Sequence, residues 1–151
     1  MIAAQERKYL NLTPPAAIID DASAAVTEID TLGFDYCEIL VILGATDIAM
    51  TALAVTESDT TGSSHANVTG LIYGTSTNIA GTTSALPSDT DDNGIFKFEI
   101  DLRGRKRFLD LTATIGDGSA GTYIAIIAIL SRAKESPNSA TKAGCSDILR
   151  V

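Results

Sequence analysis

The sequence predicts an all-β fold, a single antiparallel β-sandwich that is jelly-roll-like, with an extended N-terminal arm and a polar C-terminal tail. Short apolar segments alternate with turns rich in Gly, Ser, Thr and Asp, and they are enough for about seven or eight strands. Only 5% of the residues are aromatic and none is Trp, which favours thin, turn-rich β structure over a helical bundle. In residues 22–32, apolar side chains recur at every third position, as they do in a helix. The β-branched Thr27 and Thr31 disfavour a helix there.

The chain has the size of a single domain. Its 151 residues are 45% hydrophobic and 20% charged. A chain of this length buries roughly 68–70% of its unfolded surface. The first residues are polar and end in Pro14-Pro15, which lack N–H donors and hold the chain extended. We therefore expect an extended arm over residues 1–20, the sandwich over 21–136 and a polar tail over 137–151.

The first half of the sandwich is expected to contain three strands. Residues 26–30 form a short candidate that Gly33 ends. Residues 34–43 form a stronger one, whose two faces are both apolar from Ile39 onward, as in a strand covered on two sides. Residues 50–57 alternate again and complete this half.

The second half supplies the clearest strand signals. Residues 68–73 form a short strand, and the irregular stretch 74–93 follows, rich in Ser, Thr, Gly and Asp. A loop of this length in a small domain is usually functional or disordered. Residues 95–102 form a strand in which apolar and charged side chains alternate from Phe96 onward. Residues 108–115 and 122–130 form the last two strands around a Gly-rich hairpin loop.

Charge excludes several classes of partner. The net charge is −8, whereas a general nucleic-acid binder or a protein of anionic membranes needs a basic surface. The longest apolar stretch, residues 123–130, is far shorter than the ~20 residues that span a bilayer. The start of the chain lacks the apolar run of a signal peptide, so we expect a soluble protein that is not secreted. Cys37 and Cys145 have no disulfide or metal spacing, and Cys37 is expected to be a small buried apolar residue.

Sequence patterns give no support for catalysis. His65 is the single histidine, and no serine lies in the G-x-S-x-G pattern of a nucleophile elbow. A solvent-exposed loop histidine is the simpler interpretation. No pair among the nineteen carboxylates is singled out by position. We expect no enzyme activity and no cofactor.

The segment from Asp89 to Gly94 has the opening of a calcium loop. Asp89, Asp91 and Asn93 stand at alternate positions and Gly94 at the sixth. The twelfth position is Ile100, where such a loop needs a bidentate Glu. We therefore favour a polar Asn-Gly turn that starts the next strand, with calcium as the weaker alternative.

The least random feature of this acidic chain is a basic run. Arg103, Arg105, Lys106 and Arg107 lie within five positions, between two strongly patterned strands. The run therefore projects from one end of the sandwich. It pairs with acidic strands of the same chain, or docks on an acidic patch of another subunit, since guanidinium groups favour carboxylate partners. Nucleic acid is a third alternative.

A resemblance rests on four stretches taken together: 98–109 with this basic run, 34–39, 56–59 and 130–137. In combination, they resemble capsid decoration (cement) proteins of tailed bacteriophages, over about residues 26–137. The resemblance implies a structural virion protein on the outer surface of the head, made in the host cytoplasm. It implies binding to the major capsid protein, self-association as a homodimer or homotrimer, and no contact with nucleic acid or membrane.

Several residues are candidates for the capsid interface. They are the four basic residues together with Arg7, Lys8 and Tyr9 of the arm, which is expected to add a strand to a capsid sheet edge.

The alternative function is host recognition by a glycan-binding module of a head or tail fibre, using the loop 74–93. Carbohydrate sites usually stack sugars on exposed aromatic rings. Tyr9, Tyr73 and Tyr123 are the available rings, because the chain has no Trp and Phe96, Phe98 and Phe108 lie in strand patterns.

Overall fold

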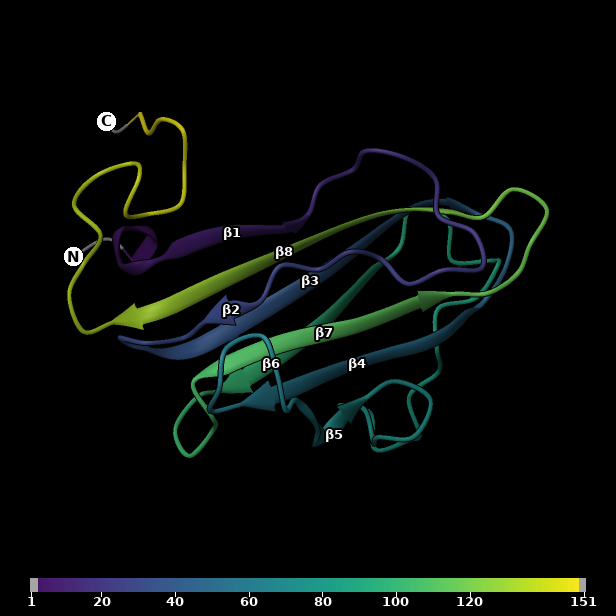
Figure 1. The fold of residues 1–151 in the computed structure, drawn as a ribbon, viewed down its shortest axis with the longest axis horizontal. Helices are drawn as coiled ribbons and strands as arrows, with labels where there is room; N and C mark the ends of the chain where they lie inside the picture. Colours follow the sequence, from purple (N-terminus) through teal and green to yellow (C-terminus); the bar gives the residue numbers. More distant parts are fainter. Residues whose placement is uncertain (1–2, 150–151) are drawn as a thin grey trace.

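The computed structural model describes residues 3–149 and consists of eight strands in two sheets (Figure 1). A short 3-10 helix, η1, precedes the first strand. The elements are η1 (Ala3–Glu6), β1 (Lys8–Thr13), β2 (Ile29–Asp30), β3 (Phe34–Thr46), β4 (Met50–Ser58), β5 (Ala66–Ile72), β6 (Ile95–Asp101), β7 (Phe108–Ile115) and β8 (Thr122–Ala133).

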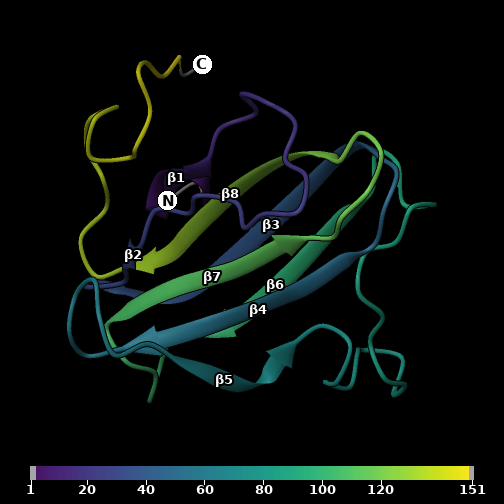
Figure 2. The same cartoon turned by 45° about the vertical axis from the view of Figure 1, so that its right-hand side comes forward.

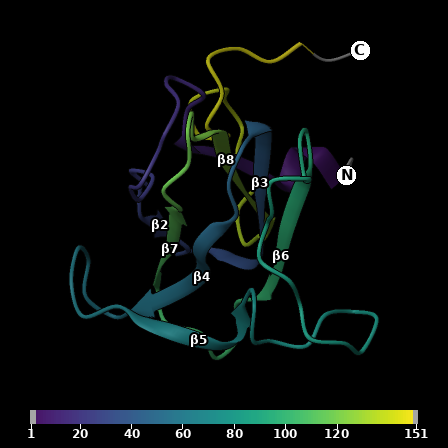
Figure 3. The same cartoon turned by 90° about the vertical axis from the view of Figure 1, so that its right-hand side faces the viewer.

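The strand order is that of a jelly roll. Sheet A has the order β1-β8-β3-β6 and sheet B the order β2-β7-β4-β5. All pairs are antiparallel, and the first strand pairs with the last, the second with the seventh, the third with the sixth and the fourth with the fifth. The two sheets pack face to face, as Figures 2 and 3 show. The predicted β-sandwich is confirmed.

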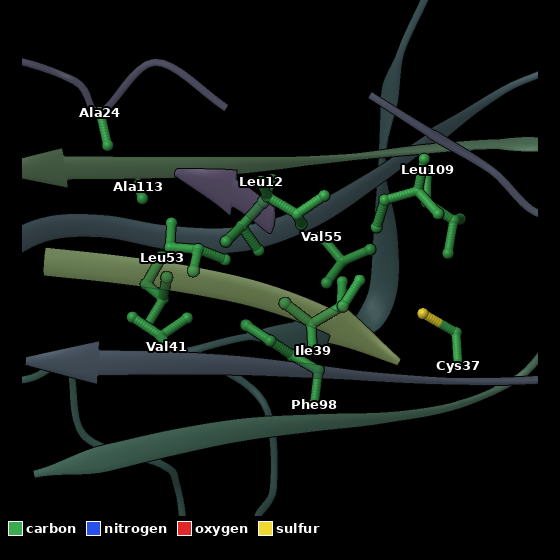
Figure 4. Packing of buried hydrophobic residues seen from close by; sticks show 14 of the residues in the cluster. Leu12, Ala24, Cys37, Ile39, Val41, Leu53, Val55, Phe98, Leu109 and Ala113 are labelled. Atoms are coloured by element: carbon green, nitrogen blue, oxygen red, sulfur yellow. The ribbon is translucent and has the colours of Figure 1, made fainter. Parts of the chain in front are cut away.

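The core lies between the sheets because inward side chains alternate along each strand. Ile39 and Val41 of β3 meet Leu53 and Val55 of β4 across the interface, and Phe98 of β6 joins them (Figure 4). Cys37 belongs to the same cluster and is fully buried, as predicted, and its burial raises the pKa of the thiol to about 12.

Residues 3–20 are not a free arm, which corrects the expectation for residues 1–20; residues 1 and 2 lie outside the described part of the chain. Residues 8–13 form β1, an edge strand of sheet A paired with β8 from Lys8–Leu130 onward. Leu12 is buried, so the alternation of Leu10 and Leu12 is that of a strand with one face in the core. One side of this segment is thus paired with its own β8, and the strand addition to a capsid sheet stays a prediction that concerns only its outer side.

Part of the C-terminal tail, the turn at residues 139–144, lies against β1. The backbone N–H of Tyr9 donates to the carbonyl of Ala143 at 2.8 Å, and Ala143 is buried. The turn at Gly144 approaches Tyr9 so closely that a Cβ there would lie 1.8 Å from its carbonyl oxygen. The tail thus covers part of the outer edge of β1, which blunts an exposed sheet edge.

Two further expectations for the strands need correction. Only Ile29–Asp30 of residues 26–30 is a strand, because most of this stretch lies outside the ladder with β7. β3 is covered by sheet B on one face only, although both of its faces are apolar. No helix among residues 3–149 is long and apolar enough to cross a membrane.

Candidate functional site

One end of the sandwich gathers the basic residues, and we call it the basic end. The starts of β1 and β7 and the ends of β6 and β8 meet there, and the turn 139–144 is tied to it through Tyr9 (Figure 1). All described lysines and arginines except Lys97 lie at this end: Arg7, Lys8, Arg103, Arg105, Lys106, Arg107, Arg132, Lys134 and Lys142. The structure therefore brings the predicted interface residues of residues 1–20 and of the β6–β7 turn to the same end.

Two arginines of the basic run bind carboxylates of the same chain. The Nε of Arg103 donates to Asp101 at 2.9 Å, and the Nε and Nη2 of Arg107 donate to Asp30 at 2.8 and 2.7 Å. These hydrogen bonds hold the pKa of both carboxyl groups below their ordinary values. Arg107 also stacks on the ring of Phe108, with 4.9 Å from Cζ to the ring centroid.

Arg105 and Lys106 both turn to Glu57 at the end of β4. The Nη1 of Arg105 lies 3.6 Å from the Glu57 carboxylate, and the backbone N–H of Lys106 donates to it at 3.2 Å. Within residues 3–149, the side chains of Lys106, Lys8 and Lys134 form no ion pair with a carboxylate. The arginines of the basic run thus pair with carboxylates of the same chain, which is one of the three uses predicted for the run. The ammonium groups of the lysines have no such partner and are available for binding another molecule.

The opposite end of the sandwich carries only carboxylates, and we call it the acidic end. It is formed by the turn after β3, the loop between β7 and β8, the segment before β2 and the turn before β6. No described lysine or arginine lies among its acidic residues, Asp20, Asp21, Asp47, Asp89, Asp91, Asp92 and Asp117. The net negative charge of the chain is thus concentrated far from the basic end.

Asp47 organises this acidic end. Its carboxylate accepts hydrogen bonds from the backbone N–H groups of Ser119, Ala120 and Gly121 at 2.7, 2.6 and 2.8 Å. These bonds, that from Ala120 foremost, lower the pKa of Asp47. Asp20 holds the same loop through the N–H of Gly118 at 2.9 Å.

The calcium alternative gains no support from the turn before β6. Asp91 accepts from the backbone N–H and the hydroxyl of Ser88 at 2.7 and 2.8 Å, and Asn93 adopts a left-handed backbone with φ 58°. Asp91 and Asn93 thus lie in the expected Asn-Gly turn, which the N–H of Gly94 closes on the carbonyl of Asp91 at 2.9 Å, and Asp89 precedes this turn. In the described part of the chain, no three His, Cys, Asp or Glu side chains are placed to hold a metal ion.

His65 is not the exposed loop histidine that the sequence suggested. Its side chain is only 15% exposed, and its Nε2 lies 3.0 Å from the carboxylate of Glu28. Glu28 also accepts from the hydroxyl of Thr61 at 2.6 Å and from the backbone N–H of Gly62 at 2.8 Å. The buried Nε2 of His65 has no hydrogen-bond partner among the described residues, so it is Glu28 that ties the β4–β5 loop to the segment before β2.

An open pocket of about 530 Å³ lies beside the first part of the loop 74–93. Residues 70–73, Ser76, Asn78, Ile79 and the edge strand β6 line it. Tyr73 is not a free ring: it packs edge-on against Phe96 and Phe98, and its hydroxyl donates to the carbonyl of Lys97 at 3.0 Å. The loop itself is pinned by its own backbone bonds and the Thr77–Thr83 bridge.

Sequence reasoning missed several residues that shape both ends. Glu28, Asp30, Asp47 and Glu57 each bind a group far away along the chain. None lies in a motif, so only the folded strand order pairs them with their partners. Compared with models of known families, with curated proteins and with solved structures, the chain has no match.

Proposed function

We propose that this chain is a structural virion protein that binds the outer surface of a phage head through its basic end and stabilises the capsid. One observation carries the proposal: all described basic residues but Lys97 gather at one end of the sandwich, together with carboxylates such as Asp30, Glu57 and Asp101, whereas the charged residues of the other end are carboxylates alone. The resemblance of residues 98–109 and the three other stretches to capsid decoration proteins supports the assignment to the outer surface of a phage head.

A divided charge suits a protein that coats a surface in one orientation. The lysines at the basic end have no carboxylate partner in residues 3–149, so they are available to an acidic capsid patch. The acidic end then faces solvent, where like charge keeps neighbouring particles apart. The binding proposed here needs no chemical reaction, and its partner is the major capsid protein.

The jelly-roll strand order also supports a role in the virion. This architecture is used by viral capsid domains and also by lectins. One fold hosts many functions, so the proposal rests on the distribution of charge and not on the jelly-roll fold.

The test is co-sedimentation of the full chain with expanded heads that lack it. The double variant Lys106→Gln, Lys134→Gln removes two unpaired charges of the basic end and leaves the arginine–carboxylate pairs intact. We expect head binding to weaken several-fold, more strongly at low salt, where unscreened charges contribute most.

A matched control carries the same change of net charge at another place. Thr112→Glu with Ser119→Glu lowers the charge equally, on sheet B and at the acidic end. Normal binding by this control, with weak binding by the lysine variant, supports the proposal. Equal binding by both variants and the natural chain contradicts it.

The pocket beside Tyr73 favours host recognition as a second candidate function. Its lining combines hydroxyl and amide side chains with apolar ones, as small polar ligands require. Glycan-array binding that Asn78→Ala abolishes would support this alternative, and co-sedimentation with heads would then fail.

A further inference from the structure

Glu28 fastens the loop between β4 and β5, residues 59–65, to the segment before β2. Its carboxylate accepts a hydrogen bond from the hydroxyl of Thr61 at 2.6 Å and another from the backbone N–H of Gly62 at 2.8 Å. The loop reaches this segment in both views of the fold (Figures 1 and 2). Thr61 and Gly62 are exposed, so these two bonds, and not burial, hold this part of the loop in place.

The backbone of the closed loop opposes closure. Gly62 has a φ of 69° and Ser64 a φ of 58°, and the left-handed conformation costs free energy for a residue with a side chain. Ser58 offsets part of this cost, since its hydroxyl donates to the carbonyl of Ser63 at 2.7 Å. An exposed loop with few buried contacts opens locally at a small cost in free energy. The contacts of Glu28 therefore set how often this loop opens.

The imidazole of His65 lies directly beside the carboxylate of Glu28. Its Nε2 is 3.0 Å from Oε2 of Glu28, and the two side chains are only 15% and 20% exposed. This nitrogen is buried and has no hydrogen-bond partner among the described residues. A hydrogen bond needs good alignment, whereas the attraction between two charges depends chiefly on their distance. A protonated imidazole would therefore bind Glu28, and a neutral one adds little.

Other charged groups surround this contact, and none of them neutralises Glu28. In the described part of the chain, His65 is the only basic side chain within ion-pair distance of Glu28. The hydroxyl of Thr61, foremost, and the N–H of Gly62 lower the pKa of Glu28, so its carboxyl group is ionised throughout the range of about pH 5 to 8 in which histidines ordinarily titrate. The charged groups of the neighbouring elements are Asp59 in the loop, Asp30 of β2 with its partner Arg107, and Glu57 of β4 with Arg105 and Lys106.

We propose that Glu28 and His65 form a pH-sensitive latch, which holds the loop 59–65 closed when the imidazole is protonated. The positive charge on His65 then adds an ion pair to the two hydrogen bonds that already join Glu28 to the loop. The neutral imidazole leaves those two bonds alone, and the loop opens more often. The latch lies at the basic end, because the strand before the loop ends opposite Phe108 at the start of β7. It uses groups of this chain only, so the inference stands independently of the proposed function.

The test is amide hydrogen exchange of the full chain, followed by NMR at pH 5.5 and 7.5. The protection factor of Gly62, which corrects for the intrinsic effect of pH on exchange, measures how often the loop opens. We expect it to be about two- to five-fold higher at pH 5.5, which is the size of effect that a partly exposed ion pair has. Gly121 is the control amide, since its N–H also donates to an exposed carboxylate, that of Asp47, at 2.8 Å. Its protection should be the same at both pH values.

Three variants separate the latch from other effects of pH. His65→Gln removes the titrating group and Glu28→Gln removes the negative charge, so the pH dependence at Gly62 should vanish in both. Asp59→Asn removes a carboxylate of the same loop and should retain the pH dependence. Equal protection of Gly62 at both pH values in the natural chain, or lower protection at pH 5.5, overturns the proposal. So does a pH dependence that persists in His65→Gln or disappears in Asp59→Asn. The natural chain alone decides the first two outcomes, so the proposal stays testable if a variant does not fold.

Discussion

The guanidinium of Arg107, directly before β7, donates two hydrogen bonds to the carboxylate of Asp30 in β2, 77 positions away in the sequence. Such a two-bond fork is specific to arginine, since a lysine offers a single point charge. The pair shows that Arg107 of the basic run stabilises the fold at its end of the sandwich. We call the Arg107–Asp30 pair a clamp, and it is separate from any binding of a partner by the basic run.

Weakening this clamp should lower the free energy of unfolding slightly, by an amount that depends on salt concentration. We expect Arg107→Lys to lower the midpoint of thermal unfolding slightly at low ionic strength, because both groups are about half exposed. At high salt the difference should shrink, since ions screen exposed charges. Lys106→Gln serves as control and should unfold like the natural chain. A loss that is independent of salt would assign the role of Arg107 to its packing on Phe108 instead.

Three carboxyl groups should make the free energy of unfolding depend on pH in the acidic range. Hydrogen bonds lower the pKa of Asp47, Asp30 and Asp101 in the folded state, so the unfolded state binds more protons at low pH. Their contribution is present above the unfolded pKa of about 3.9 and is lost as the pH falls through the folded values. We expect a flat free energy of unfolding from about pH 7 to 5 and a decline below about pH 4.

Asp47→Asn should make this acid decline shallower, which denaturant titration at several pH values measures. Asp117→Asn is the control on the same end, because Asp117 makes no hydrogen bond within the described residues. Identical slopes for Asp47→Asn and the natural chain would show that the loop 116–121 does not depend on the Asp47 carboxylate.

The two cysteines should differ in reactivity. Cys37 is fully buried and burial raises the pKa of its thiol to about 12, whereas Cys145 is partly exposed. Because the thiolate is the nucleophile, an aromatic disulfide reagent should label only Cys145 in the native protein at pH 8 and both thiols in denaturant. The Cys145→Ser variant should stay unlabelled until it unfolds. Rapid native labelling of that variant would mean that β3 opens readily.

Gly144 should hold the C-terminal turn on β1. A Cβ at this residue would lie 1.8 Å from the Tyr9 carbonyl oxygen, and its φ of 74° is one that L residues rarely adopt. Gly144→Ala should therefore free the turn and expose the Tyr9 N–H to hydrogen exchange. Gly62→Ala is a matched control, with φ 69° and nothing within 4 Å of the added Cβ. It should cost only about 1 kcal/mol of backbone strain and leave Tyr9 protected.

Local alternation explains how much of the fold can be predicted from the sequence. Residues 95–102 and Phe108–Ile115 show period-two patterns, because one of their faces is in the core and the other is in water. β1 has the same pattern at Leu10 and Leu12, but it is short and the following prolines favoured a free arm.

The candidate sites depend on long-range pairing and could be predicted less well. The contact of His65 with Glu28 and the binding of residues 119–121 by Asp47 arise from strand order, which no local pattern contains. The apolar outward side chains of β3 were visible as a two-sided apolar strand. Only the structure shows that sheet B covers one of those sides and that the side chains of the other are mostly half-buried.

The most direct test of the central claim, binding to a phage head, is the copy number of this chain per purified virion, by quantitative mass spectrometry. A place on the head surface predicts many copies in a simple ratio to the major capsid protein. A few copies per particle would instead indicate a tail or fibre position, and absence from the virion would contradict the account.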